Sequence, residues 1–172
     1  RWACASWTRV GLSRPRHRVV LGTFWIGQFV DDDQRTALRT QLLRFEPTEI
    51  LIHKKALRPA TEQLLHQECP FAMITPVDPN KPFSSSALVS LVETAHLFDN
   101  AEKPEQNGQW PEALRRLMKD AHSFKPEFEI SMSCLFLCVA YLNRCCVANL
   151  LMSARAFSFI DSIDAGLGCG VI

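Results

Sequence analysis

The chain contains no long hydrophobic run. Among its 172 residues, the longest apolar stretch is Cys134–Leu142, far shorter than the roughly 20 residues needed to cross a bilayer. No apolar segment of the signal-peptide type follows the arginines near the start. We therefore expect neither a membrane-spanning segment nor a secretory signal. The chain also begins with Arg1 rather than methionine, which we interpret as the mark of a fragment or partial gene product.

Motifs for phosphate binding and for nucleophilic catalysis are also missing. No G-x-x-x-x-G-K-[ST] loop for ATP and no G-x-S-x-G nucleophile turn occur in the sequence. The glycines near the end form a G-x-G-x-G pattern that no helix follows, and the histidines are dispersed. We therefore predict no catalytic residue and no cofactor-binding residue in this chain.

Seven cysteines are present, but none belongs to a C-x-x-C pair or to a Cys/His set with zinc spacing. Cys134, Cys138 and Cys145 fall on one face of an expected helix. The odd count would leave one thiol over in any disulfide framework. We interpret the cysteines as small buried hydrophobic residues in a reducing compartment, and we predict no metal site.

The charge of the chain is uneven. The formal net charge is +1, yet Arg1, Arg9, Arg14, Arg16 and Arg18 lie in the first 20 residues, which contain no acid. The remaining chain carries 14 basic and 18 acidic side chains, so its charge does not favour binding to a polyanion. Because the basic start shows no periodicity, we predict that residues 1–17 are disordered or artefactual rather than a nucleic-acid-binding arm.

Residues 22–54 have the pattern of a β-α-β unit. Phe24, Ile26 and Phe29 are typical of a strand that covers a core, and Asp31–Asp33 supply acceptors for the start of a helix over 35–45. The short apolar run 50–52 then predicts a strand buried on both faces.

Alternating strands and helices are predicted for the rest of the chain. The expected elements are a helix over 58–67, a core strand over 71–75, a helix over 84–98 with its N-cap among Ser84–Ser86, a helix over 110–121, and a buried helix from 129 to at least 142. Residues 99–109 read as a polar linker. These elements predict an α/β fold with helices on both faces of a sheet.

Several strings in this order resemble the connector domain of the MutS family of DNA mismatch-repair proteins. They are IGQFVDDD (26–33), EPTEILIHK (46–54) and the late segment CVAYLNRCCVANLLMSARAFSFI (138–160). The similarity covers roughly residues 19–164 and is greatest to the eukaryotic homologue that forms the larger subunit of the base-mismatch sensor.

The resemblance implies a ribonuclease-H-like mixed sheet and a mechanical role. Such a module links mismatch binding to ATP-driven clamp formation and offers a surface to a MutL-type partner. Its parent protein would bind mismatched DNA, pair with a second MutS homologue, use ATP and Mg²⁺ in another domain, and act in the nucleus. We therefore expect a connector-like domain over 18–164 and an irregular tail over 165–172.

The resemblance is weakest at the start of the domain. Where the family has an apolar first strand, this chain has Ser13–Arg18, whose proline and arginines do not suit a buried central strand. We therefore expect the first strand to be missing or degraded. The candidate partner surface is the exposed side of the helix after Asp33 with the following turn, represented by Arg35, Arg39, Lys54 and Lys55.

Two alternatives remain. One is a stand-alone ribonuclease-H-like or Rossmann-like interaction domain without catalysis. The other is a metal-dependent nuclease that uses Asp31, Asp32 and Asp33 with Asp78; consecutive acids point in different directions, which favours a helix cap over a two-metal site.

Overall fold

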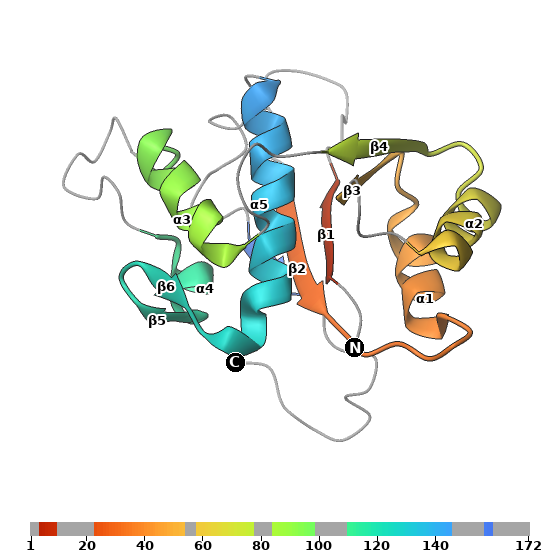
Figure 1. The fold of residues 1–172 in the computed structure, drawn as a ribbon, viewed down its shortest axis with the longest axis horizontal. Helices are drawn as coiled ribbons and strands as arrows, with labels where there is room; N and C mark the ends of the chain where they lie inside the picture. The colour runs from red at the N-terminus through yellow and green to blue at the C-terminus, as the bar shows by residue number, and fades with distance from the viewer. Residues whose placement is uncertain are drawn as a thin grey trace, which may run out of the picture.

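The computed structural model describes residues 4–9, 23–53, 58–77, 84–98, 110–145 and 157–159 (Figure 1). The elements are β1 (Cys4–Arg9), β2 (Thr23–Gln28), α1 (Thr36–Phe45), β3 (Glu49–His53), α2 (Pro59–Glu68), β4 (Met73–Val77), α3 (Ser85–Thr94), α4 (Glu112–Arg115), β5 (Met118–Asp120), β6 (Ser123–Phe124), η2 (Pro126–Phe128), α5 (Glu129–Arg144) and β7 (Phe157–Phe159). The α/β class expected from the sequence is confirmed.

The described strands form three small sheets rather than one continuous sheet. In the first, β2 lies between β1 and β7; β1 runs antiparallel with Trp7 opposite Trp25, and β7 runs parallel with Phe157 opposite Phe24. β3 and β4 form a parallel pair, and β5 and β6 form an antiparallel pair. The first sheet is mixed, as expected.

A first strand is present, although the sequence predicted that it would be missing or degraded. It is β1, which lies within the segment 1–17 that we expected to be disordered or artefactual, and it pairs with β2 along its full length. Strand pairing uses main-chain groups, so it does not need the apolar periodicity that this segment lacks. Ser13–Arg18 and the tail 165–172 lie outside the described residues. The proposed domain limits stay predictions.

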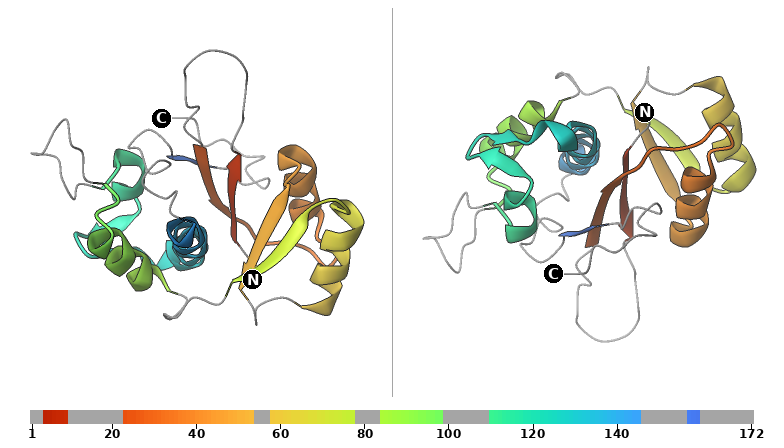
Figure 2. Two further views of the ribbon diagram at one scale, coloured as in Figure 1. Left: turned by 90° about the horizontal axis from the view of Figure 1, so that it is seen from above. Right: turned by 90° about the horizontal axis from the view of Figure 1, so that it is seen from below.

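Helices lie on both sides of the β1–β2 pair, as Figure 2 shows: α3, α4 and α5 on one side, and α1 and α2, with β3 and β4, on the other. β2 serves both sides because neighbouring side chains of a strand point to opposite faces. Phe24 and Ile26 are buried in the cluster that includes Leu135 of α5, whereas Trp25 meets Phe45 of α1 with ring centroids 6.1 Å apart.

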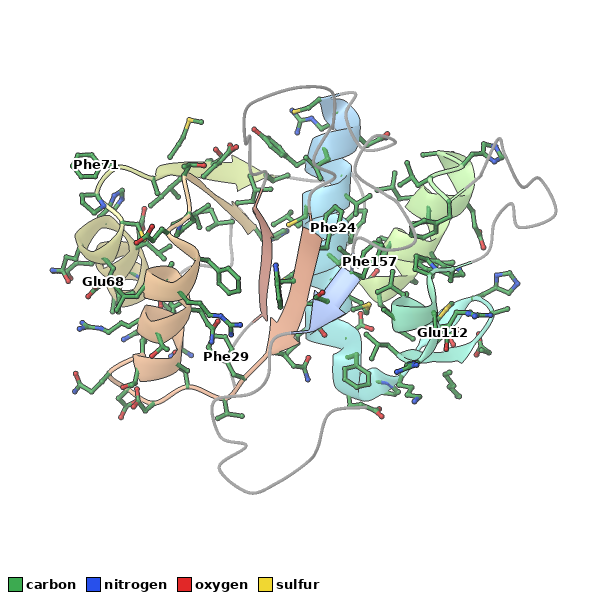
Figure 3. All side chains as sticks on the ribbon, turned by 180° about the vertical axis from the view of Figure 1, so that it is seen from behind. Phe24, Phe29, Glu68, Phe71, Glu112 and Phe157 are labelled. Carbon is green, nitrogen blue, oxygen red and sulfur yellow. The ribbon has the colours of Figure 1, made fainter. Side chains whose placement is uncertain are left out.

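Two hydrophobic clusters account for most of the described core. The larger cluster joins β2, β7, α3, α5 and the α4–β6 region, and Phe24 stacks on Phe157 at a centroid distance of 5.2 Å within it (Figure 3). The smaller cluster consists of Leu42, Ile50, Leu64 and Leu65, between the β3–β4 pair and helices α1 and α2.

Several predicted helices are confirmed. α1 and α2 lie within about one residue of their predicted limits, and Leu64 and Leu65 of α2 are buried as expected. Ser84 is the N-cap of α3, as predicted, and accepts a hydrogen bond from the backbone N–H of Ala87. α3 ends at Thr94, so the predicted limit at residue 98 is wrong; His96, with a positive φ of 50°, follows the helix. α5 begins at Glu129, as predicted, and most of the residues from 131 to 139 are buried.

The predicted strand over 71–75 is wrong in position. The strand begins at Met73, and Phe71 is 98% exposed in the turn before it, where Figure 3 shows the ring at the outer edge of the molecule. The apolar run 71–74 contains no mark that separates turn from strand, so hydrophobicity alone placed the strand too early. β3 is less buried than predicted: Ile50 is its only buried residue, and the strand has a paired neighbour, β4, in a two-stranded sheet.

The predicted helix over 110–121 is also wrong in length. Only Glu112–Arg115 is helical, and β5 and β6 follow as a short hairpin. Asp120 favours the turn of this hairpin because its carboxylate accepts hydrogen bonds from the His122 backbone N–H and the Ser123 hydroxyl. These local bonds compete with helix continuation.

Candidate partner surface

Two of the three consecutive acids, Asp31 and Asp32, cap α1. The Asp31 carboxylate accepts hydrogen bonds from the backbone N–H groups of Ala37 (2.9 Å) and Leu38 (3.0 Å), and Asp32 accepts from the backbone N–H (2.9 Å) and hydroxyl (2.7 Å) of Thr36. These bonds satisfy N–H groups that have no partner within a helix. The predicted capping role is therefore confirmed for Asp31 and Asp32, whereas Asp33 contributes only its backbone carbonyl, to Arg35.

Hydrogen bonding also sets the charge state of this cap. The backbone N–H of Thr36 and then its hydroxyl hold the pKa of the Asp32 carboxyl below its ordinary value. Asp32 therefore stays ionised at the helix N-terminus, where the helix dipole favours a negative charge.

Arg35 lies at the N-cap position of α1 and braces the helix rather than extending freely into solvent. Its backbone adopts the left-handed conformation (φ 54°), which is uncommon for a residue with a side chain. The guanidinium donates from Nε to the Thr61 hydroxyl of α2 at 3.0 Å and from Nη1 to the Asp33 carbonyl at 3.0 Å. Arg35 is half-buried and links α1 to α2.

Of the two members of the predicted surface that the structure describes, Arg39 is more exposed than Arg35. Its Nη1 lies 3.4 Å from Oε1 of Glu68 near the end of α2, and its side chain is 47% exposed. An exposed ion pair of this kind contributes about 0–1 kcal/mol, so a partner can compete for the guanidinium at little cost. The pairing of Arg39 with Glu68 was not predicted, because the order of residues in the chain does not show that α1 and α2 pack together.

The structure brings Arg35 and Arg39 to one side of α1. Lys54 and Lys55, the other two residues of the predicted surface, lie outside the described residues. Arg44, near the end of α1, lies over the rings of Trp25 (5.7 Å) and Phe45 (5.3 Å), at distances typical of cation–π contacts.

A cavity of about 590 Å³ lies on the opposite side of the molecule, beside α3, Trp110 and the β5–β6 hairpin. Phe98 and Trp110 give it an aromatic wall, with ring centroids 5.3 Å apart. Two charged groups around it are already paired: Glu93 with His122, and Arg115 with Glu112. Lys119 and Asp120 also line the cavity, so side chains of both charge signs surround it.

Within the described part of the chain, no group of three or more His, Cys, Asp or Glu side chains is placed to hold a metal ion. Asp31 and Asp32 are engaged with α1, and Asp78, the fourth acid of the nuclease alternative, is not among the described residues. In the same ranges, no helix has the length and apolar character that a membrane crossing needs.

The arrangement defines an α/β scaffold with a basic helix face held against a second helix. No family model matches the chain. It is similar to the DNA mismatch repair protein Msh6 of Homo sapiens (26% identity over 151 residues, 84% of this chain) and of Gallus gallus (24% over the same length), and to the probable DNA mismatch repair protein Msh6 of Drosophila melanogaster (24% over 129 residues, 73% of this chain).

These similarities confirm the resemblance to the MutS family and to its Msh6 type. The chain spans 11% of the length of each of these relatives.

Proposed function

We propose that the chain is the connector module of a DNA mismatch-recognition protein. It links the binding of mismatched DNA to ATP-driven clamp formation, and it offers a surface to a MutL-type protein. The observation that carries the proposal is the similarity to mismatch repair proteins over most of the chain, 84% for two of the relatives. The parent protein would pair with a second MutS homologue and act in the nucleus.

The architecture supports a mechanical role. The central β2 strand is covered by helices on both faces, and ring contacts bind it to both sides: Phe24 to Phe157, and Trp25 to Phe45. Side chains in such close packing have few alternative positions, so a force applied on one side reaches the other.

A chimeric protein tests the role of the module. The matching segment of a Msh6 protein is replaced by this chain, and the mutation rate is measured in cells that lack their own Msh6. We expect the chimera to lower the mutation rate, while a version with the segment deleted does not. A chimera that is expressed and forms its dimer, but leaves the mutation rate at the level of the deletion, contradicts the proposal.

Charge reversal tests the partner surface. We expect Arg39→Glu to weaken capture of a MutL-type protein by the full 172-residue chain. Arg115→Glu is the matched control, because Arg115 is exposed to a similar degree and lies beside the cavity on the opposite side. Arg35 is a poor choice for reversal since it braces α1 against α2. Equal capture by the Arg39→Glu variant and the unchanged chain rules out this surface.

A further inference from the structure

The two hydrophobic clusters share no side chain among the described residues. The larger one includes α5 through Met132, Leu135 and Val139, and the smaller one holds the β3–β4 pair against α1 and α2. Trp25 and Phe45 form one connection between the two sides, between β2 and α1. Polar side chains form another connection, between the end of α5 and the β3–β4 pair.

Glu49 is the centre of this polar connection. Tyr141, in the last turn of α5, donates its hydroxyl to Oε1 of Glu49 at 2.8 Å. Thr75 of β4 donates its hydroxyl to the same oxygen at 2.5 Å. One carboxylate oxygen of β3 thus accepts from both a helix and the neighbouring strand.

The strand register explains why Glu49 is available to α5. In β3, Ile50 and Ile52 belong to the smaller cluster, so Glu49 and Leu51 point to the opposite face of the pair. Thr75 lies opposite Leu51 and therefore points to the same side as Glu49. The apolar face thus packs on α1 and α2, while the other face presents Glu49 to α5.

We infer that Glu49 is the positioning residue that couples α5 to the β3–β4 pair and, through it, to the smaller cluster. The inference deepens the proposed connector role and rests on it for its biological meaning. Hydrogen bonds to an ionised acceptor are shorter and stronger than neutral ones, and they fix the direction of both donors. If α5 moves along its axis, the bond from Tyr141 to Glu49 therefore displaces β3 in the same direction.

The environment of Tyr141 offers a direct spectroscopic signal. The hydrogen bond to Glu49, followed by burial, raises the pKa of the Tyr141 phenol. Tyr141 is the single tyrosine of the chain, so the absorbance of tyrosinate reports this group alone.

An absorbance titration of the full chain tests the contact itself. We expect the phenol to ionise above the ordinary value of about 10 in the unchanged protein and closer to that value in Glu49→Gln. Circular dichroism over the same pH range shows which points belong to the folded state. Ionisation at the ordinary pH in the folded, unchanged protein, or ionisation at the same pH in the unchanged protein and in Glu49→Gln, overturns the inference.

Hydrogen exchange tests the coupling. Tyr141→Phe should speed amide exchange in β3 and β4 on the order of tenfold, because it removes a hydrogen bond to a charged group. The matched control is Thr40→Val, which removes a side-chain bond within α1 alone, from the Thr40 hydroxyl to the Thr36 carbonyl.

A second substitution separates coupling from a local effect. Val139→Ala loosens the larger cluster, since Val139 is fully buried there. With the Tyr141 hydroxyl present, this change should speed exchange in β3, β4 and α2; with Tyr141→Phe the response there should be smaller. Equal responses with and without the hydroxyl overturn the inference. The measurement needs no DNA or partner protein, so its failure is distinguishable from failure of the connector role.

Discussion

Asp31 and Asp32 are neighbours in the sequence but accept hydrogen bonds from different residues at the start of α1. Asp31 reaches forward to the N–H groups of Ala37 and Leu38, while Asp32 holds both polar groups of Thr36. Asp33 contributes its backbone carbonyl to Arg35. The sequence predicted a cap from this run of acids, but which acid serves which N–H depends on the left-handed turn at Arg35, and composition carries no sign of that turn.

Removing the Asp31 carboxylate should destabilise the chain. We expect Asp31→Ala to lower the free energy of unfolding by about 0.5–2 kcal/mol, the usual cost of a lost N-cap. Urea denaturation followed by circular dichroism measures it. Asp33→Ala removes the same charge next to the helix but keeps the Asp31 cap, and it should cost less. Equal losses in the two variants would show that charge alone, not the hydrogen bonds, stabilises the helix start.

The Asp32 carboxyl should make stability depend on pH in the acid range. Because the Thr36 bonds depress its pKa in the folded state, its contribution is fully present above the unfolded value of about 3.9 and is lost as the pH falls through the folded pKa. We expect Asp32→Asn to be less stable than the unchanged chain at pH 7, and the difference to shrink below about pH 4. A difference that stays constant down to pH 2 would contradict this assignment.

At the scale of elements, the sequence predicted the long periodic segments well. The sequence predicts α5 because its apolar residues continue for several turns. It predicts α2 because Pro59 and Pro70 lie at the two ends of the helix. Two predictions failed for different reasons. The run over 71–75 is too short for periodicity to separate strand from turn, and the helix over 110–121 gives way to a hairpin where Asp120 forms local turn bonds. Of the partner surface, the exposure of Arg39 was predictable and the bracing role of Arg35 was not, because its acceptor Thr61 lies in another helix.

The junction of α3 and α5 depends on a side-chain contact over a long sequence separation. Glu129, the first residue of α5, accepts from the Ser85 backbone N–H at 2.9 Å and from the Ser85 hydroxyl at 2.5 Å. Glu129 therefore caps the start of α3 while it begins its own helix.

Glu129→Ala should reduce stability by about 1–3 kcal/mol, because it leaves the buried Ser85 donors without their acceptor. Thermal and urea unfolding measure the loss. Glu127→Ala is the control, since it removes the same charge from the exposed η2 turn just before α5. If both variants lose the same stability, the contact between the helices contributes nothing measurable.

At the scale of the whole molecule, stability depends on the larger cluster. This cluster gathers side chains from α3, α5, β2, β7 and the α4–β6 region, whereas the smaller one has four buried members. Damage to the larger cluster is therefore expected to unfold more of the chain.

Leu135→Ala should destabilise the chain by about 2–5 kcal/mol, because the leucine is fully buried and its truncation leaves a cavity. Leu43→Ala makes the same chemical change at a site that is 66% exposed, and it should stay within about 0.5 kcal/mol of the unchanged chain. Denaturant titration of both variants measures the difference. Comparable losses would show that the larger cluster does not dominate.

The order of strands in the central sheet has a consequence for synthesis. β2 pairs on one edge with β1, which leaves the ribosome before it, and on the other edge with β7, which is made more than a hundred residues later. Until β7 emerges, β2 has an open edge, and unpaired strand edges favour aggregation. The newly made chain therefore passes through a period in which Phe24 lacks its stacking partner, and chaperones are expected to bind it at that stage.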